Sequence, residues 1–112
     1  MRIRKETDIM DQEEIALIAR CSDALGHPVR VQVFRYIYKE NMQRRTVCNK
    51  DLVAATGYAQ ATISQHLSKL CYSGLVETQK KETYSYYYVN IGILGKYLNA
   101  FKRSCIGQRI GS

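Results

Sequence analysis

The sequence predicts a mainly α-helical fold with one small β-hairpin, built from about five helices and two strands. Three observations predict this fold. Apolar residues recur every three or four positions through most of the chain, which is the spacing of one face of a helix. Glycines and the single proline separate these segments. One short stretch, residues 84–89, is rich in tyrosine, and tyrosine favours a pleated strand.

The first predicted helix begins at Asp11, after a polar tail over residues 1–10 that we expect to be flexible. Asp11 and Glu14 have the spacing of a capping box, in which side chains accept hydrogen bonds from free backbone N–H groups. Behind them, residues at helical spacing predict one buried stripe: Ile15, Ile18, Ala19, Ser22 and Leu25. Gly26 ends this helix.

The second predicted helix begins at Pro28, because the first turn of a helix does not need the N–H group that proline lacks. It runs to about Glu40. Its buried face consists of Val29, Val33, Phe34 and Ile37. A polar, basic turn follows from Asn41 to Arg45.

Two further helices are predicted on either side of Gly57. The first contains Leu52, Val53 and Ala55 and ends at Thr56. The second runs from about Gln60 to Ser73. Its apolar side is formed by Ile63, Leu67 and Leu70. Gly57 can adopt the left-handed conformation that redirects the chain, so this segment is a helix-turn-helix.

A hairpin and a last helix complete the prediction. Gly74 ends the preceding helix, and strands over residues 75–78 and 84–89 flank a charged tip over residues 79–83. The last helix has apolar or thiol side chains at helical spacing: Leu94, Leu98, Phe101 and Cys105. Gly92 and Gly95 weaken its start. A chain of 112 residues has room for one modest core, so we expect residues 11–112 to form a single domain.

Basic residues are concentrated after the first part of the chain. Residues 1–23 carry four basic and six acidic side chains, whereas residues 24–112 carry thirteen and four, within a net charge of +7. Such a basic body suits a polyanionic partner, because phosphate contacts release condensed counterions. Charge alone is equally consistent with a basic protein that binds no nucleic acid. The chain has no long apolar run and no secretory signal, so we expect no membrane association and a cytoplasmic location.

The stretch from Asp51 to Asn90, DLVAATGYAQATISQHLSKLCYSGLVETQKKETYSYYYVN, resembles the ArsR/SmtB family, as does ALGHPVR at residues 24–30. The resemblance extends over roughly residues 15–105. That family consists of dimeric winged helix-turn-helix repressors that release DNA on sensing a metal ion or another signal. The resemblance therefore implies a winged helix-turn-helix fold, a homodimer built by the first and last helices, and double-stranded DNA as partner.

The helix after Gly57 presents a small, polar face opposite Ile63. Glutamine can pair with the edge of adenine, and hydroxyl groups can contact bases or phosphates. By the resemblance, Gln60, Ser64 and Gln65 occupy DNA-contacting positions. The full candidate set on this helix is Gln60, Ala61, Thr62, Ser64, Gln65, Ser68 and Lys69. Without its context, the same face would be read as an ordinary solvated one.

Three other features near this helix have simpler interpretations. Lys80 and Lys81, at the predicted hairpin tip, are placed to reach phosphates. His66 points nearer the apolar side of its helix, which predicts a packed, hydrogen-bonded histidine. The tyrosines of residues 84–88 alternate in and out of the sheet, and this favours a structural role over a stacking platform for single strands.

No metal site or cofactor is expected. The four cysteines have no CxxC spacing, and His27 and His66 are not spaced to complete a zinc site with them. Arsenic and cadmium sensors of the family place two cysteines around one residue, where this chain has Cys48 and Lys50. The family's zinc site on the last helix needs carboxylates and histidines, which residues 94–109 lack.

Thiol chemistry is the remaining way to sense a signal. Cys21 and Cys105 belong to the two helices that, by the resemblance, form the dimer interface. Oxidation could link them through a disulfide or polysulfide bridge. The alternative is that both are small buried hydrophobic residues. The inducer, whether a small molecule, an oxidant or none, stays open.

The sequence contains no nucleophile elbow, phosphate loop or paired acids in an apolar setting, so we expect no enzyme. It predicts a sequence-specific DNA-binding transcriptional regulator, acting as a repressor, that binds a pseudo-palindromic operator as a homodimer. The alternative is a winged-helix protein-interaction module that has lost DNA binding. A basic wing and a polar helix face argue against that alternative.

Overall fold

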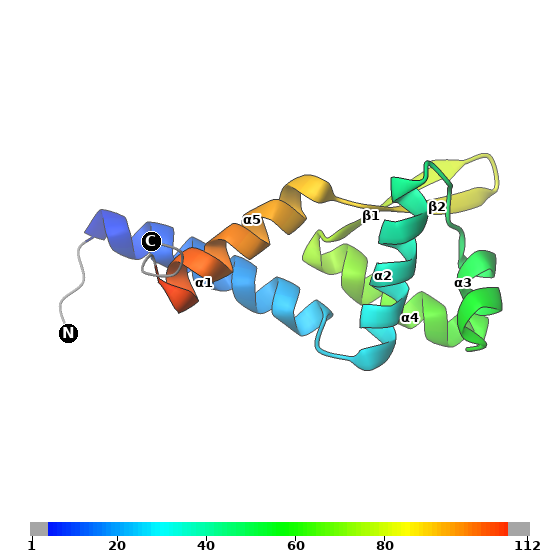
Figure 1. The fold of residues 1–112 in the computed structure, drawn as a ribbon, viewed down its shortest axis with the longest axis horizontal. Coiled ribbons are helices and arrows are strands. Elements are labelled where there is room, and N and C mark those ends of the chain that lie inside the picture. Colours follow the sequence, from blue (N-terminus) through cyan, green and yellow to red (C-terminus); the bar gives the residue numbers. More distant parts are fainter. Residues whose placement is uncertain (1–4, 108–112) are drawn as a thin grey trace.

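The computed structural model describes residues 5–107, and side chains from residue 12 onward. The chain forms five α-helices and a two-stranded antiparallel hairpin, which confirms the predicted fold class. Figure 1 shows how these elements are arranged. The elements are α1 (Lys5–Ala24), α2 (Pro28–Met42), α3 (Asn49–Thr56), α4 (Gln60–Ser73), β1 (Val76–Lys81), β2 (Tyr84–Val89) and α5 (Ile91–Phe101), followed by a short π-helical segment, η1 (Lys102–Ile106). No helix in this described part is long and apolar enough to cross a membrane.

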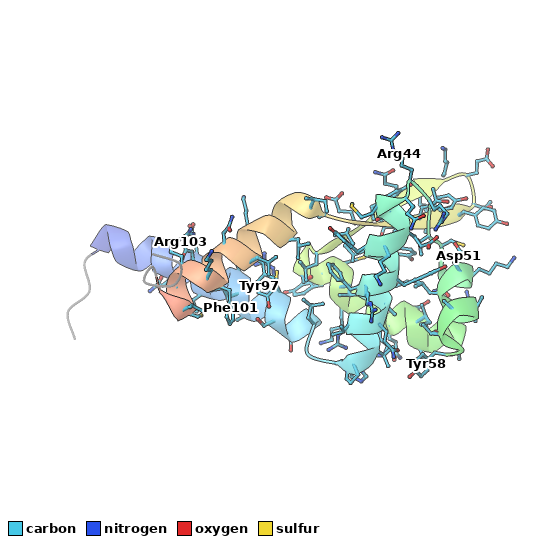
Figure 2. The ribbon with its side chains drawn as sticks, viewed as in Figure 1. Arg44, Asp51, Tyr58, Tyr97, Phe101 and Arg103 are labelled. Carbon is cyan, nitrogen blue, oxygen red and sulfur yellow. The ribbon has the colours of Figure 1, made fainter. Side chains whose placement is uncertain are left out.

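The molecule is elongated, with extents of 51 × 26 × 25 Å. Helices α2, α3 and α4 and the hairpin form a body at one end, and α1 and α5 lie side by side and project from it (Figure 1). Glu14 of α1 accepts hydrogen bonds from Arg103 of η1. The Ser22 hydroxyl lies 2.9 Å from the Tyr97 hydroxyl of α5. Figure 2 labels Tyr97, Phe101 and Arg103 on this paired region.

Helix α1 differs from its prediction in length. It begins at Lys5 and not at Asp11, so residues 5–10, which we expected in the flexible tail, are helical. The expectation for residues 1–4 lies outside the described residues. A helix that is stabilised by packing further along the chain can extend into a polar segment such as residues 5–10.

The buried face of α1 also differs from the predicted stripe. Leu17, Cys21 and Ala24 face the core, and Cys21 is completely buried. Ile15 is 59% exposed, and Ala19 is exposed. The helix has two apolar faces, and the core of a single chain covers only the one with spacing i, i+4, i+7. The other face stays on the surface.

The core lies between α2, α4 and the start of the hairpin, as the periodicity of α2 and α4 predicts. Residues of α1 and of the short segment before α3 also contribute to the core. Its completely or almost completely buried residues are Cys21, Val33, Ile37, Val47, Leu52, Ile63, Leu67, Leu70, Leu75 and Val76. Gly57 and Gly74 end α3 and α4 with φ angles of 81° and 90°, and a side chain at either position would be strained.

The hairpin tip is shorter than predicted. Lys81 pairs with Tyr84, so only Glu82 and Thr83 form the turn. Residues 79–81, which we expected in a charged loop, extend β1 instead. Their partners are Tyr84, Ser85 and Tyr86. Cross-strand pairing with aromatic side chains stabilises a strand that its own composition does not favour.

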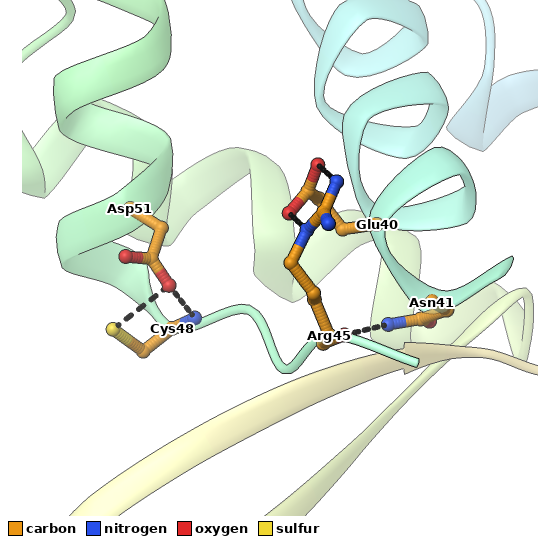
Figure 3. Close-up of polar contacts among 5 residues, drawn as sticks. All are labelled: Glu40, Asn41, Arg45, Cys48 and Asp51. Carbon is orange, nitrogen blue, oxygen red and sulfur yellow. Dashed lines mark hydrogen bonds and ion pairs between the residues drawn. The ribbon is translucent and has the colours of Figure 1, made fainter. Parts of the chain in front are cut away.

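The hairpin is anchored to the segment that joins α2 and α3. The Tyr87 N–H donates to the Val47 carbonyl at 2.8 Å, and the Val89 N–H donates to Asn41 Oδ1 at 3.0 Å. Asn41 Nδ2 also donates to the Arg45 carbonyl at 3.2 Å, and Arg45 forms a two-point ion pair with Glu40 (Figure 3). These bonds fix β2 beside the start of α3.

Candidate nucleic-acid interface

Helix α4 presents a continuous exposed face next to the hairpin. Of the residues predicted to contact DNA, those exposed on this helix are Gln60, Ala61, Ser64, Gln65, Ser68 and Lys69. Thr62 is half-buried. The structure therefore brings six of the seven helix candidates onto one surface. That surface is polar and carries a positive charge at Lys69.

Ser64 is tied to the preceding helix by a contact that sequence reasoning missed. Asn49 Nδ2 donates to Ser64 Oγ at 2.9 Å. Because the serine oxygen accepts this bond, its own hydrogen stays free to donate. The other end of the amide, Asn49 Oδ1, is buried and has no hydrogen-bond partner. Asn49 opens α3, fifteen residues before its partner, and no local pattern marks such a contact.

The two hairpin lysines are the last two residues of β1, directly before the two-residue turn, and they lie on opposite faces of the hairpin. Lys80 pairs with Ser85, and Lys81 pairs with Tyr84. Side chains alternate along a strand, so Lys80 shares a face with the buried Val76. That face turns toward the helical body, whereas Lys81 lies on the outer face. Only Lys80 lies on the face of the hairpin that continues toward α3 and α4.

His66 is the packed, hydrogen-bonded histidine that the sequence predicts. Its Nδ1 accepts from Arg30 Nη1 at 3.3 Å, and its ring centroid lies 4.7 Å from that of His27. Desolvation by burial lowers the pKa of His66, and the nearby His27 and Arg30 lower it further. The imidazole of His66 is therefore neutral, and its Nδ1 serves as a hydrogen-bond acceptor.

Arg30 connects three elements at this point. Its Nε donates to the Ala24 carbonyl at 2.6 Å and its Nη2 to the Asp23 carbonyl at 3.3 Å, at the end of α1. His27, which contacts His66, caps the start of α2 by accepting from the Val29 N–H at 3.1 Å. The end of α1, the start of α2 and the middle of α4 are thus joined by one charged and two aromatic side chains.

Cys48 and Lys50 stand at the start of α3. The Cys48 N–H donates to Asp51 Oδ2 at 3.0 Å, and its thiol lies 3.4 Å from the same oxygen (Figure 3). This arrangement is a helix cap. Among the side chains of residues 12–107, no three histidines, cysteines or acidic residues are grouped so that they could hold a metal ion.

Cys21 and Cys105 do not meet within one chain. Cys21 is completely buried, with its thiol 4.0 Å from the Ser73 carbonyl, and burial raises its pKa. Cys105 is exposed on η1. Its neighbour Ser104 contacts Glu14, which precedes Cys21 by about 10 Å along α1. A bridge between them would require a second chain or a displacement of α1, because disulfide partners have Cα atoms within about 7 Å.

An apolar strip remains uncovered on the paired helices α1 and α5. Its residues are Ile15 of α1 and, on α5, Ile91, Leu98 and Phe101. The three on α5 are 52%, 55% and 39% exposed. Leu98 and Phe101 follow the helical spacing that the sequence shows. Phe101 packs edge-on against Tyr97 on the same helix, with ring centroids 6.5 Å apart. Nothing in the described part of a single chain covers this strip.

Comparison with known proteins agrees with this geometry. Residues 27–78 match the family model described as bacterial regulatory protein, arsR family. The chain is 32% identical over 78 residues to a protein assigned as an arsenical resistance operon repressor, ArsR2, from Halobacterium salinarum. That match covers 70% of this chain and 63% of the relative, so the chain spans less than two thirds of the relative's length.

Solved structures share the fold. An ArsR-like transcriptional regulator from Rhodococcus sp. RHA1 superposes with a TM-score of 0.69 at 22% identity, covering 80% of this chain and 79% of that one. A homodimeric winged helix-turn-helix DNA-binding domain from Mycobacterium bovis gives a TM-score of 0.62 at 20% identity, covering 88% and 85%. The chain therefore has the winged helix-turn-helix fold of these solved structures, and its residues 27–78, which include the helix-turn-helix, match the arsR family model.

Proposed function

We propose that this protein is a transcriptional repressor that binds a pseudo-palindromic operator in double-stranded DNA as a homodimer. The observation that carries the proposal is the exposed polar face of α4, held beside an anchored hairpin. Helix α4 has 14 residues, so it is about 21 Å long, and a helix of about 10–12 Å diameter fits the major groove of B-DNA. Gln65 lies at the centre of this face as the candidate base reader.

The uncovered strip on α1 and α5 supports the homodimer. Ile15, Leu98 and Phe101 are exposed together, and pairing across a two-fold axis would bury them in an interface of the same residues on both subunits. The Mycobacterium bovis domain with this fold is homodimeric. Such a dimer places two α4 helices to read two half-sites about 10–11 base pairs apart, or a multiple of that spacing.

The repressor role draws on the Halobacterium salinarum relative, which is assigned as an operon repressor. DNA as the partner places the proposed activity in the cytoplasm with the chromosome. The inducer stays open, because Cys21 and Cys105 are separated within the chain and no metal cluster occurs in its described part.

Fluorescence anisotropy with labelled duplex DNA at several salt concentrations tests this proposal, alongside sedimentation of the free protein. We expect a dimer at micromolar concentration and an affinity for random duplexes that falls steeply as salt rises. A dimer that binds no duplex at low salt would refute the proposal and favour a protein-interaction module.

A further inference from the structure

A groove opens between α3, α4 and β2, beside the exposed face of α4. Its volume is about 570 Å³. The first turn of α3 forms one wall, the start of α4 the second, and the distal part of the hairpin the third. The polar residues that line it include Asn49, Lys50, Gln60, Ser64, Thr83 and Ser85.

The walls of this groove are fixed by contacts within the protein. Asp51 caps the start of α3 through the Cys48 N–H (Figure 3). Tyr87 of β2 bonds to Val47, the residue before Cys48. Asn49 joins α3 to Ser64 of α4. A ligand that enters the groove therefore meets a preformed site.

The side chains in the groove suit an anion with several oxygen atoms. They offer the Lys50 ammonium group, amide groups and hydroxyl groups, and no lining residue is acidic. Lys50 is exposed and forms no ion pair within the part of the chain that the structure describes. In the nearby Asp51 carboxylate, Oδ2 accepts a hydrogen bond from the Cys48 N–H. Ammonium and hydroxyl donors are the groups that hold phosphate oxygens in protein–DNA complexes.

The position of the groove agrees with a phosphate of the DNA backbone. A helix about 10–12 Å across fills a major groove about 12 Å wide, so the elements that flank α4 meet the sugar–phosphate backbone at the edge of the groove. Gln60 and Ser64 belong both to the exposed face of α4 and to the groove wall. A DNA strand whose bases face α4 would thus bring one of its phosphates over Lys50 and Ser85.

We propose that this groove binds one backbone phosphodiester of the operator in each subunit, with Lys50 as its cation and Ser85 as a hydroxyl donor. The inference rests on the proposed function and adds a positioning role for Asn49, which holds Ser64 against α3. Neither Lys50 nor Ser85 belongs to the surface that the sequence alone predicts.

The test compares Lys50→Gln, Lys50→Arg and the matched control Lys96→Gln, which removes the same charge from α5, a helix that does not line the groove. Affinity for an operator duplex and a random duplex is measured across a salt series. Each lost phosphate contact reduces the slope of log affinity against log salt by about 0.9, so Lys50→Gln in a dimer should reduce it by about 1.8. At about 0.15 M salt, this change in slope corresponds to a loss of affinity of about 30-fold in Lys50→Gln, for both duplexes.

Lys50→Arg should keep the wild-type slope, and Lys96→Gln should leave slope, affinity and dimerisation unchanged. An unaltered slope in Lys50→Gln, while the wild type binds duplex DNA, would overturn the phosphate site without affecting the proposed function. Wild-type protein that binds no duplex would overturn both. Millimolar inorganic phosphate should not raise the melting temperature. A rise in wild type that is absent from Lys50→Gln would overturn the assignment to the DNA backbone in favour of a free anion.

Discussion

Replacing Asn49 with alanine should weaken DNA binding without destabilising the protein. The Asn49 side chain makes one hydrogen bond, from Nδ2 to Ser64 Oγ at 2.9 Å. Its Oδ1 is buried and unpaired. The substitution therefore removes one favourable contact and one unfavourable burial together. The two effects have opposite signs, and their magnitudes decide the outcome.

The lost hydrogen bond costs about 0.5–1.5 kcal/mol, and the removed unpaired oxygen returns about 1–3 kcal/mol. Alanine also favours a helix more than asparagine does, by a few tenths of a kcal/mol. The expected stability of Asn49→Ala thus ranges from nearly unchanged to about 3 kcal/mol above wild type. The matched variant Ser64→Ala removes the hydrogen bond but keeps the unpaired oxygen, so it should lose about 0.5–1.5 kcal/mol.

Urea denaturation followed by circular dichroism measures both changes, and anisotropy with operator DNA measures binding. Both variants should bind the operator more weakly, because the Ser64 hydroxyl is misplaced in one and missing in the other. A loss of more than about 1 kcal/mol in Asn49→Ala would refute the reasoning. It would mean that the buried amide oxygen is satisfied and that Asn49 serves stability alone.

Three further predictions concern the helix junction, the dimer and the reading face. The pKa of His66 is lowered in the folded state, so the native protein binds fewer protons than the unfolded one, and its stability should fall as the pH drops below about 6.5. In urea titrations, His66→Gln should reduce this dependence of stability on pH. An equal dependence in both proteins would contradict the prediction. Leu98→Glu or Phe101→Glu should convert the dimer to monomers in sedimentation, whereas an intact dimer in both would place the interface elsewhere. Gln65→Ala should cost about 1–3 kcal/mol on the best operator and reduce discrimination against other sequences; unchanged discrimination would mean that α4 is oriented differently on DNA.

The ends of α3 and α4 and the buried side of α4 could be predicted closely because their determinants are local. Gly57 and Gly74 both adopt positive φ angles, a conformation that few other residues tolerate. The periodic apolar residues Ile63, Leu67 and Leu70 are all buried. Where a single residue or a regular spacing decides the backbone, the sequence is sufficient.

Elements that depend on a distant partner were predicted less well. Residues 79–81 join β1 because tyrosines of β2 pair with them, and their own charged composition gives no sign of it. Helix α1 has two apolar faces, and periodicity cannot tell that Leu17 and Cys21 face the core while Ile15 stays exposed. That choice depends on the packing of α4 and α5.

The candidate site shows the same division. The exposed face of α4 follows from helix geometry around Ile63. Which of Lys80 and Lys81 faces the helical body depends on the hairpin register, which a turn two residues long sets. The roles argued for Asn49 and Lys50 depend on contacts of α3 with α4 and β2. Such contacts join residues 15 or more positions apart in the sequence, so no local motif predicts them.

Selection of bound duplexes from a random DNA pool tests the central claim most directly. Wild-type protein should enrich a pseudo-palindrome whose half-sites are about 10–11 base pairs apart, or a multiple of that spacing. Gln65→Ala, selected in parallel, should enrich a more degenerate version of the same sequence. A wild-type pool that stays random after repeated rounds, or that converges on a sequence without two-fold symmetry, would contradict the claim that a symmetric dimer reads DNA through α4.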